Sequence, residues 1–132
     1  MLRVETARTI AAAGILWEPV PGDRFTIAQE SLAGQVFWIS DLTIEVHHFQ
    51  DQTVLGFNGT TEWALDSVPL DLAIWMPRED QLRALLGDRL ETLRRTEAGW
   101  EVTIRAGGER SAYIRDDVEE AYAAALIAVA TP

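Results

Sequence analysis

The stretch AIWMPREDQLRALLG, residues 73–87, predicts a short apolar strand that leads directly into a helix. Pro77 suits the first helical position, because its ring fixes φ and that position's N–H has no partner within the helix. Glu79 and Asp80 place negative charge in the first turn, where the helix dipole favours it. The leucines that follow recur at helical spacing, and Gly87 suits the end of the helix.

Upstream of this stretch, the pattern predicts one helix and then a run of strands. The helix covers residues 4–13, and the strands cover residues 24–28, 35–40, 42–49 and 53–57. In the second strand, Val36 to Ile39 are all large and apolar, which predicts burial on both faces. The third strand alternates apolar and polar residues, as an antiparallel strand with one face in the core does. It is expected to form a hairpin, or part of a meander, with the fourth.

Downstream of the central helix, one segment is ambiguous. Leu90 and Leu93 have helical spacing within residues 89–96, but a strand with solvent-facing arginines fits the same segment. Asp116 or Asp117 is expected to cap a final helix whose first turn is acidic. Two alternating segments joined by a Gly-Gly turn predict a hairpin before that helix, at residues 100–105 and 110–115.

Helices on either side of runs of strands predict an α+β fold, with a mostly antiparallel sheet packed by N- and C-terminal helices. The length of 132 residues fits a single domain covering residues 1–132. The formal net charge is −10, and all 11 basic residues are arginine. Nucleic-acid binders gain affinity from basic residues that displace counterions, so we expect no nucleic-acid partner. The same charge argues against binding to anionic membrane surfaces.

Several activities are excluded by residues that the sequence lacks. Without lysine there is no Schiff base and no phosphate-loop lysine, and without cysteine there is no disulfide, thiolate nucleophile or iron–sulfur cluster. No cofactor motif occurs, so we expect no cofactor. No apolar run approaches the ~18 residues that cross a bilayer, and the N-terminus lacks the layout of a signal peptide. We therefore expect a cytoplasmic protein without membrane contact.

Short motifs are spread over most of the chain: Trp17-Glu18-Pro19 with Gly22-Asp23 and Phe25, Gly56-Phe57-Asn58-Gly59-Thr60-Thr61-Glu62-Trp63, Trp75-Met76-Pro77 with Gln81-Leu82, and Trp100. Their order resembles a family of small uncharacterised proteins encoded by bacteria and phages. Some members carry a pilus-assembly label, which belongs to a MinD-like ATPase family. Such an ATPase needs a glycine-rich phosphate loop with a lysine, and this chain has neither, so we reject an ATPase. The resemblance implies no chemistry, because fold does not imply function.

Glu45 and His47 are the first candidates for a binding site. They share one face of their strand, whereas the neighbouring His48 lies on the other face. With a further carboxylate such as Asp41 they fit a metal ion, but a closed zinc site normally has about four ligands, and we predict no metal.

Asn58, Thr60, Thr61, Trp63 and Asp66 are the second group of candidates, around the glycine-flanked turn that follows the fourth strand. A polar loop with an aromatic residue suits a small ligand or a peptide. Turn and capping chemistry explains the same residues, with a threonine that caps a short helix.

Catalytic residues are not predicted. No serine lies in a Gly-x-Ser-x-Gly elbow. Asp23 follows Pro21-Gly22, and it fits a carboxylate that satisfies the N–H groups of the turn better than it fits a catalytic one.

We therefore expect a non-enzymatic binding or accessory domain that meets a protein partner through an exposed tryptophan or its acidic surface. The alternative is a small-ligand-binding protein or hydrolase that uses the Glu45/His47 face and residues 58–66. A third hypothesis is an acidic mimic of nucleic acid, based on charge alone. An open sheet edge would also allow a homodimer across a two-fold axis.

Overall fold

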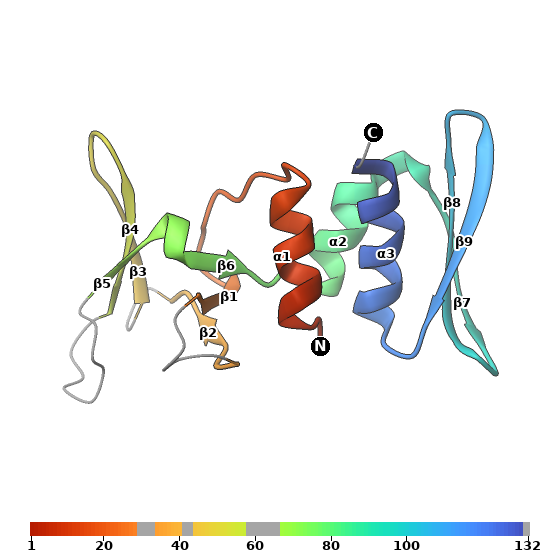
Figure 1. Ribbon diagram of the computed structural model, residues 1–132, viewed down its shortest axis with the longest axis horizontal. Helices are drawn as coiled ribbons and strands as arrows, with labels where there is room; N and C mark the ends of the chain where they lie inside the picture. The colour runs from red at the N-terminus through yellow and green to blue at the C-terminus, as the bar shows by residue number, and fades with distance from the viewer. Residues whose placement is uncertain (29–33, 41–43, 58–66, 131–132) are drawn as a thin grey trace. The chain divides into compact units, whose positions relative to one another are not determined.

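The computed structural model describes residues 1–28, 34–40, 44–57 and 67–130, which form two compact units (Figure 1). The helical unit combines Met1–Leu16 with the chain from Pro77 onward. The strand unit is Trp17–Met76. Every described strand pairs antiparallel with its neighbours, and the described strands form three separate sheets of three. Together with the helices, these sheets confirm the predicted α+β class.

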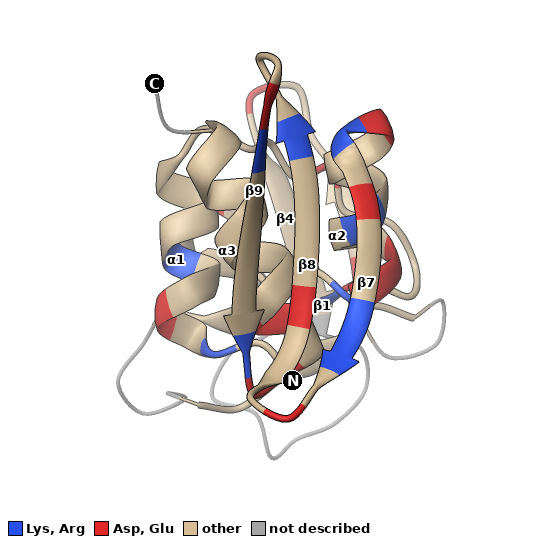
Figure 2. Cartoon of the chain, turned by 90° about the vertical axis from the view of Figure 1, so that its right-hand side faces the viewer, with Lys and Arg blue, Asp and Glu red and all other residues tan. Residues whose placement is uncertain are grey.

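The helical unit consists of three α-helices on one face of a sheet. The helices are α1 (Val4–Ala12), α2 (Glu79–Leu86) and α3 (Val118–Ala130), and the sheet order is β7 (Leu90–Thr96), β8 (Gly99–Ala106), β9 (Glu109–Arg115), with the 3₁₀ turn η3 (Gly87–Arg89) before it. Helix α3 contacts β8, β9 and both other helices. Val102 and Ile104 of β8 and Tyr122 and Leu126 of α3 are buried in the core of this unit. Figure 2 shows no helix of the described residues over the other face of this sheet.

Within residues 89–96, Leu90–Thr96 form strand β7, which resolves the ambiguity of the pattern, and Arg89 ends the 3₁₀ turn before it. Pairing of β7 with β8 satisfies the backbone groups of this segment, and the helical spacing of its leucines does not decide its structure. The predicted hairpin between β8 and β9 is confirmed. Its two turn residues, Gly107 and Gly108, have φ of +60° and +81°, as a two-residue turn with φ > 0 at both positions requires.

The described residues of the strand unit form two sheets. One has the order β2 (Phe37–Trp38), β1 (Arg24–Ile27), β6 (Ala73–Trp75), and the other has the order β3 (Ile44–His48), β4 (Thr53–Phe57), β5 (Ser67–Pro69), with the 3₁₀ turn η2 (Leu70–Leu72) between β5 and β6. Their shared core is made of apolar side chains from both sheets: Phe25, Ile27, Phe37, Ile39, Ile44, Leu55 and Val68. The short strand β5 was not predicted, and its proline is tolerated because β5 is an edge strand.

Helix α2 begins later than predicted. Pro77 is not its first residue, because the helix starts at Glu79 with Arg78 at the N-cap. The side chain of Gln81 accepts the Arg78 N–H at 2.9 Å, which closes the first turn at this point. Among the described residues, no helix is both long and apolar enough to cross a membrane.

Candidate functional site

Glu45 and His47 lie on one face of β3, as the alternation predicts. Glu45 Oε2 and His47 Nε2 are 3.8 Å apart, and 38% and 43% of the two side chains are exposed. This separation is suitable for an ion pair with a protonated imidazole, but it is longer than a hydrogen bond. Glu45 therefore does not select one tautomer of the imidazole through a hydrogen bond.

Gly56 provides the space that the imidazole occupies. It lies directly opposite Glu45 in the pairing of β3 with β4. A Cβ atom at this position would come within 2.7 Å of the His47 ring, so a larger residue would displace the imidazole. The ring of Phe49 is exposed and its centroid is 6.5 Å from that of the imidazole. This face therefore presents a carboxylate, an imidazole and a phenyl ring to solvent.

The chemistry available to this face is limited. Within the described ranges, no group of three or more His, Asp or Glu side chains is placed to hold a metal ion. The second histidine, His48, lies directly opposite Thr53, and its Nδ1 is 3.3 Å from the threonine hydroxyl. A single carboxylate–imidazole pair can exchange a proton with a small molecule, but it holds no molecule in a fixed position.

The second predicted group, Asn58, Thr60, Thr61, Trp63 and Asp66, lies outside the described residues, as do Asp41 and the predicted short helix. The structure therefore describes the Glu45/His47 half of the predicted ligand site, and the other half stays a prediction.

Asp23 accepts a backbone N–H of the turn before β1, as predicted. It is buried, and its Oδ2 accepts hydrogen bonds from Trp17 Nε1 at 2.9 Å and from the backbone N–H of Val20 at 3.2 Å. The indole of Trp17 stacks on that of Trp75, with ring centroids 6.2 Å apart and planes inclined by 1°. These contacts give Asp23 a structural role.

The exposure of Trp38 was not predicted from the sequence. We predicted burial of residues 36–39 on both faces, and this prediction was wrong, because Trp38 is 50% exposed whereas Phe37 and Ile39 are buried. Strand β2 is an edge strand whose alternate side chains point away from the core. The run of large apolar residues concealed this alternation.

Arg24 contacts the exposed indole. It lies directly opposite Trp38 in the pairing of β1 with β2, and its guanidinium carbon is 5.9 Å from the indole centroid, within the range of a cation–π contact. Arg24 is only 6% exposed, and its Nε donates a hydrogen bond to the carbonyl oxygen of Met76 at 2.8 Å. A buried and hydrogen-bonded cation therefore positions an aromatic ring that is open to solvent.

Figure 2 shows charged residues of both signs along β7, β8 and β9. Several of them pair on the outer face of this sheet, opposite the buried Val102 and Ile104. Glu91 accepts hydrogen bonds from the Nε atoms of Arg105 and Arg110, both at 2.8 Å, and these bonds lower the pKa of its carboxyl group. Arg94 donates to Glu101 across the sheet at 3.0 Å. These carboxylates are paired with arginines, so they do not form a row of negative charge.

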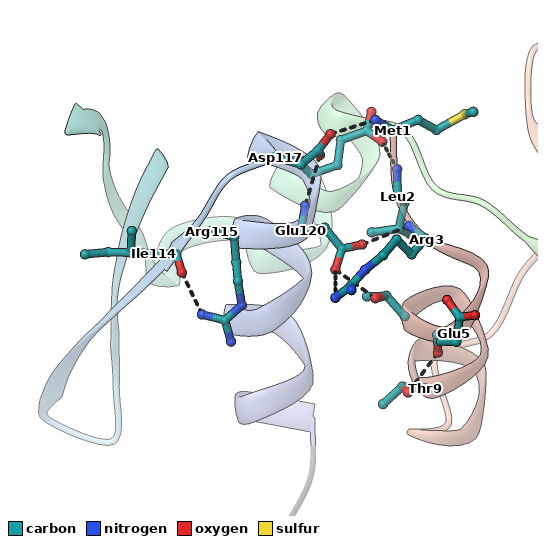
Figure 3. A network of polar contacts seen from close by, with 11 residues as sticks. Met1, Leu2, Arg3, Glu5, Thr9, Ile114, Arg115, Asp117 and Glu120 are labelled. Atoms are coloured by element: carbon teal, nitrogen blue, oxygen red, sulfur yellow. Dashed lines mark hydrogen bonds and ion pairs between the residues drawn. The ribbon is translucent and has the colours of Figure 1, made fainter. Parts of the chain in front are cut away.

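Glu120 of α3 accepts hydrogen bonds from residues at the start of α1 (Figure 3). It is 8% exposed, and its carboxylate accepts hydrogen bonds from the Arg3 N–H at 2.9 Å, the Thr6 hydroxyl at 2.8 Å and the Arg3 guanidinium at 3.2 Å. Arg3 is the N-cap residue of α1, and it makes no side-chain capping bond of its own. A carboxylate from another helix therefore takes the place of a local cap.

Asp117 caps α3, and it is one of the two residues that were predicted to cap the final helix. One of its oxygens accepts the N–H groups of Glu119 at 2.8 Å and Glu120 at 3.3 Å, and the other accepts the terminal ammonium of Met1 at 2.7 Å. Burial alone would raise the pKa of this carboxyl group. The bonds to the ammonium and the backbone outweigh burial, and they hold the pKa below its ordinary value of 3.8.

No family model, curated protein or solved structure matches the chain. The resemblance to the family of small bacterial and phage-encoded proteins therefore stays a prediction.

Proposed function

We propose that the chain is a non-enzymatic accessory domain that binds a protein partner through Trp38. The observation that carries this proposal is a half-exposed indole in cation–π contact with a buried arginine. Tryptophan dominates the binding energy of many interfaces, because it buries a large apolar area. A ring that is already positioned loses little further entropy on binding.

The charge of the chain indicates the kind of partner. A net charge of −10 favours a surface with basic residues around an apolar pocket. The Arg24 guanidinium covers one side of the indole, so the other side is the part that the partner would contact.

The test compares three forms of the full chain as immobilised baits in native lysate. Wild type should recover a stoichiometric partner, and Trp38→Ala should lose it. Phe49→Ala is the matched control, because Phe49 is also exposed and aromatic but follows β3, in the other sheet's part of the strand unit. Circular dichroism checks that all three baits are folded. Recovery of the same partner by Trp38→Ala, or repeated recovery of none by wild type, would contradict the proposal.

A ligand-binding or hydrolytic role of the Glu45/His47 face is the second candidate. It is supported by the 3.8 Å separation of a partly exposed carboxylate and imidazole. The imidazole resonances of His47 should then shift when small esters or amides are added, while those of His48 stay in place as an internal control. Equal shifts of both histidines, or shifts of neither, would count against this role. The third hypothesis, a mimic of nucleic acid, gains no support from the outer face of the β7-β8-β9 sheet, where Glu91 and Glu101 are paired with arginines.

A further inference from the structure

The open edge of β9 presents backbone groups whose direction is set by the preceding turn. The two-residue turn Gly107-Gly108 is closed by the pair Ala106–Glu109. The closing pair of such a hairpin is hydrogen-bonded, and bonded and non-bonded pairs alternate along antiparallel strands. Every second residue from Glu109 onward therefore bonds to β8. The residues between them direct their N–H and C=O groups to the open edge, namely Arg110, Ala112 and Ile114.

A side-chain contact agrees with this alternation. The carbonyl oxygen of Ile114 accepts a hydrogen bond from Arg115 Nη1 at 2.8 Å (Figure 3), as expected for a carbonyl that faces the edge. Among the described strands, β9 pairs with β8 alone.

The two edges of this sheet differ in their ability to accept another strand. Strand β7 has a register shift between Leu90 and Thr92, and such bulges interrupt the row of free backbone groups. Strand β9 pairs with β8 without a shift from Glu109 to Arg115. It is therefore the edge that offers seven regular residues.

The sequence of β9 is complementary to itself when two copies run antiparallel about Ala112. Glu109 then lies opposite Arg115 of a second copy on both sides of the axis, and opposite charges in directly paired positions are favourable. Ala112 meets its own copy at the axis, where a small side chain permits close approach. Registers centred on Ser111 or Tyr113 would pair fewer residues and would separate the opposite charges.

We propose that two copies of the chain associate through β9, antiparallel about a two-fold axis at Ala112, and form one continuous sheet from the two β7-β8-β9 sheets. Arg115 releases the carbonyl of Ile114, which accepts the N–H of Arg110 from the second copy. The guanidinium then pairs with Glu109 of that copy. This association is independent of the role of Trp38, which lies in the strand unit.

Sedimentation of the full chain over a range of concentrations tests the proposal. Wild type should show a monomer–dimer equilibrium. Glu109→Arg and Arg115→Glu each replace two attractive pairs by two repulsive ones, so each should raise the dissociation constant on the order of tenfold. Glu97→Arg is the matched control, because it makes the same charge change in the exposed turn between β7 and β8 and should leave the equilibrium unchanged.

A mixture of the two charge variants separates this register from other interfaces. The two arginines of Glu109→Arg face the two glutamates of Arg115→Glu, so the mixture should form a heterodimer as strong as the wild-type dimer. Circular dichroism confirms that each variant is folded. A chain that stays monomeric at every concentration overturns the proposal. So does a dimer that neither reversal weakens, or a mixture in which no heterodimer forms.

Discussion

Replacing Glu120 by alanine should destabilise the helical unit strongly, because its carboxylate is the acceptor for the start of α1. The change leaves the part-buried Arg3 N–H and Thr6 hydroxyl without this acceptor. A hydrogen bond to a charged group contributes about 1.5–3 kcal/mol, and an unsatisfied buried donor costs about 1–3 kcal/mol. The Arg3 guanidinium is exposed, so its ion pair adds little. We expect a loss of about 2–4 kcal/mol in the free energy of unfolding.

Urea unfolding followed by far-ultraviolet circular dichroism is the appropriate assay. All α-helices of the described residues lie in the helical unit, so the helical signal reports on that unit. Glu120→Gln keeps the shape and one acceptor oxygen, and it should lose about half as much free energy as alanine does. Thr6→Val removes the hydroxyl donor alone. A double-mutant cycle of Thr6→Val with Glu120→Ala should show a coupling of about 1 kcal/mol.

An exposed acidic residue provides the control. Glu97→Ala should change the free energy of unfolding by no more than about 0.5 kcal/mol. If Glu120→Ala shifts the urea midpoint no further than Glu97→Ala, or if the cycle shows no coupling, then the carboxylate does not stabilise α1.

Two further predictions concern the same unit. Gly99 has φ of +132°, and a Cβ atom there would collide with the carbonyl oxygen of Arg115, so Gly99→Ala should cost about 2 kcal/mol or more in urea unfolding. Gly107→Ala, with φ of +60° and open space around it, should cost only about 1 kcal/mol, and equal losses would contradict the steric argument. The pKa of Asp117 is lowered in the folded state, so its contribution to stability is complete above its unfolded pKa and is lost as the pH falls through the folded one. In Asp117→Asn, the free energy of unfolding should therefore fall less steeply as the pH drops below about 4. An unchanged pH profile of the urea midpoint would refute this.

Local features of the sequence predicted much of the fold. Alternation and the turn at Gly107-Gly108 predicted the β8–β9 hairpin, because both act over a few residues. Residues 89–96 stayed ambiguous, since their structure depends on pairing with β8 and not on their own spacing. The start of α2 was misplaced because a side chain of the helix, Gln81, decides where the first turn closes.

The candidate site was less predictable, because its contacts join distant parts of the chain. Arg24 and Met76 are 52 positions apart, and no local pattern indicates that one donates to the other. The shared face of Glu45 and His47 follows from strand alternation alone, and it was predicted correctly. The space that Gly56 leaves for the imidazole depends on cross-strand register, which the sequence did not specify.

The acidic start of α3 illustrates how a local interpretation can be incomplete. The first turn was expected to be acidic because negative charge favours the dipole of its own helix. Glu120 also accepts the N–H of Arg3 at the start of α1, although the two residues are 117 positions apart. Glu119 accepts the N–H of Leu2 at 2.9 Å. These carboxylates are engaged within the helical unit, so part of the negative charge is structural. A partner attracted by the remaining charge would still need an apolar anchor, and the half-exposed Trp38, in contact with Arg24, is the anchor that we propose.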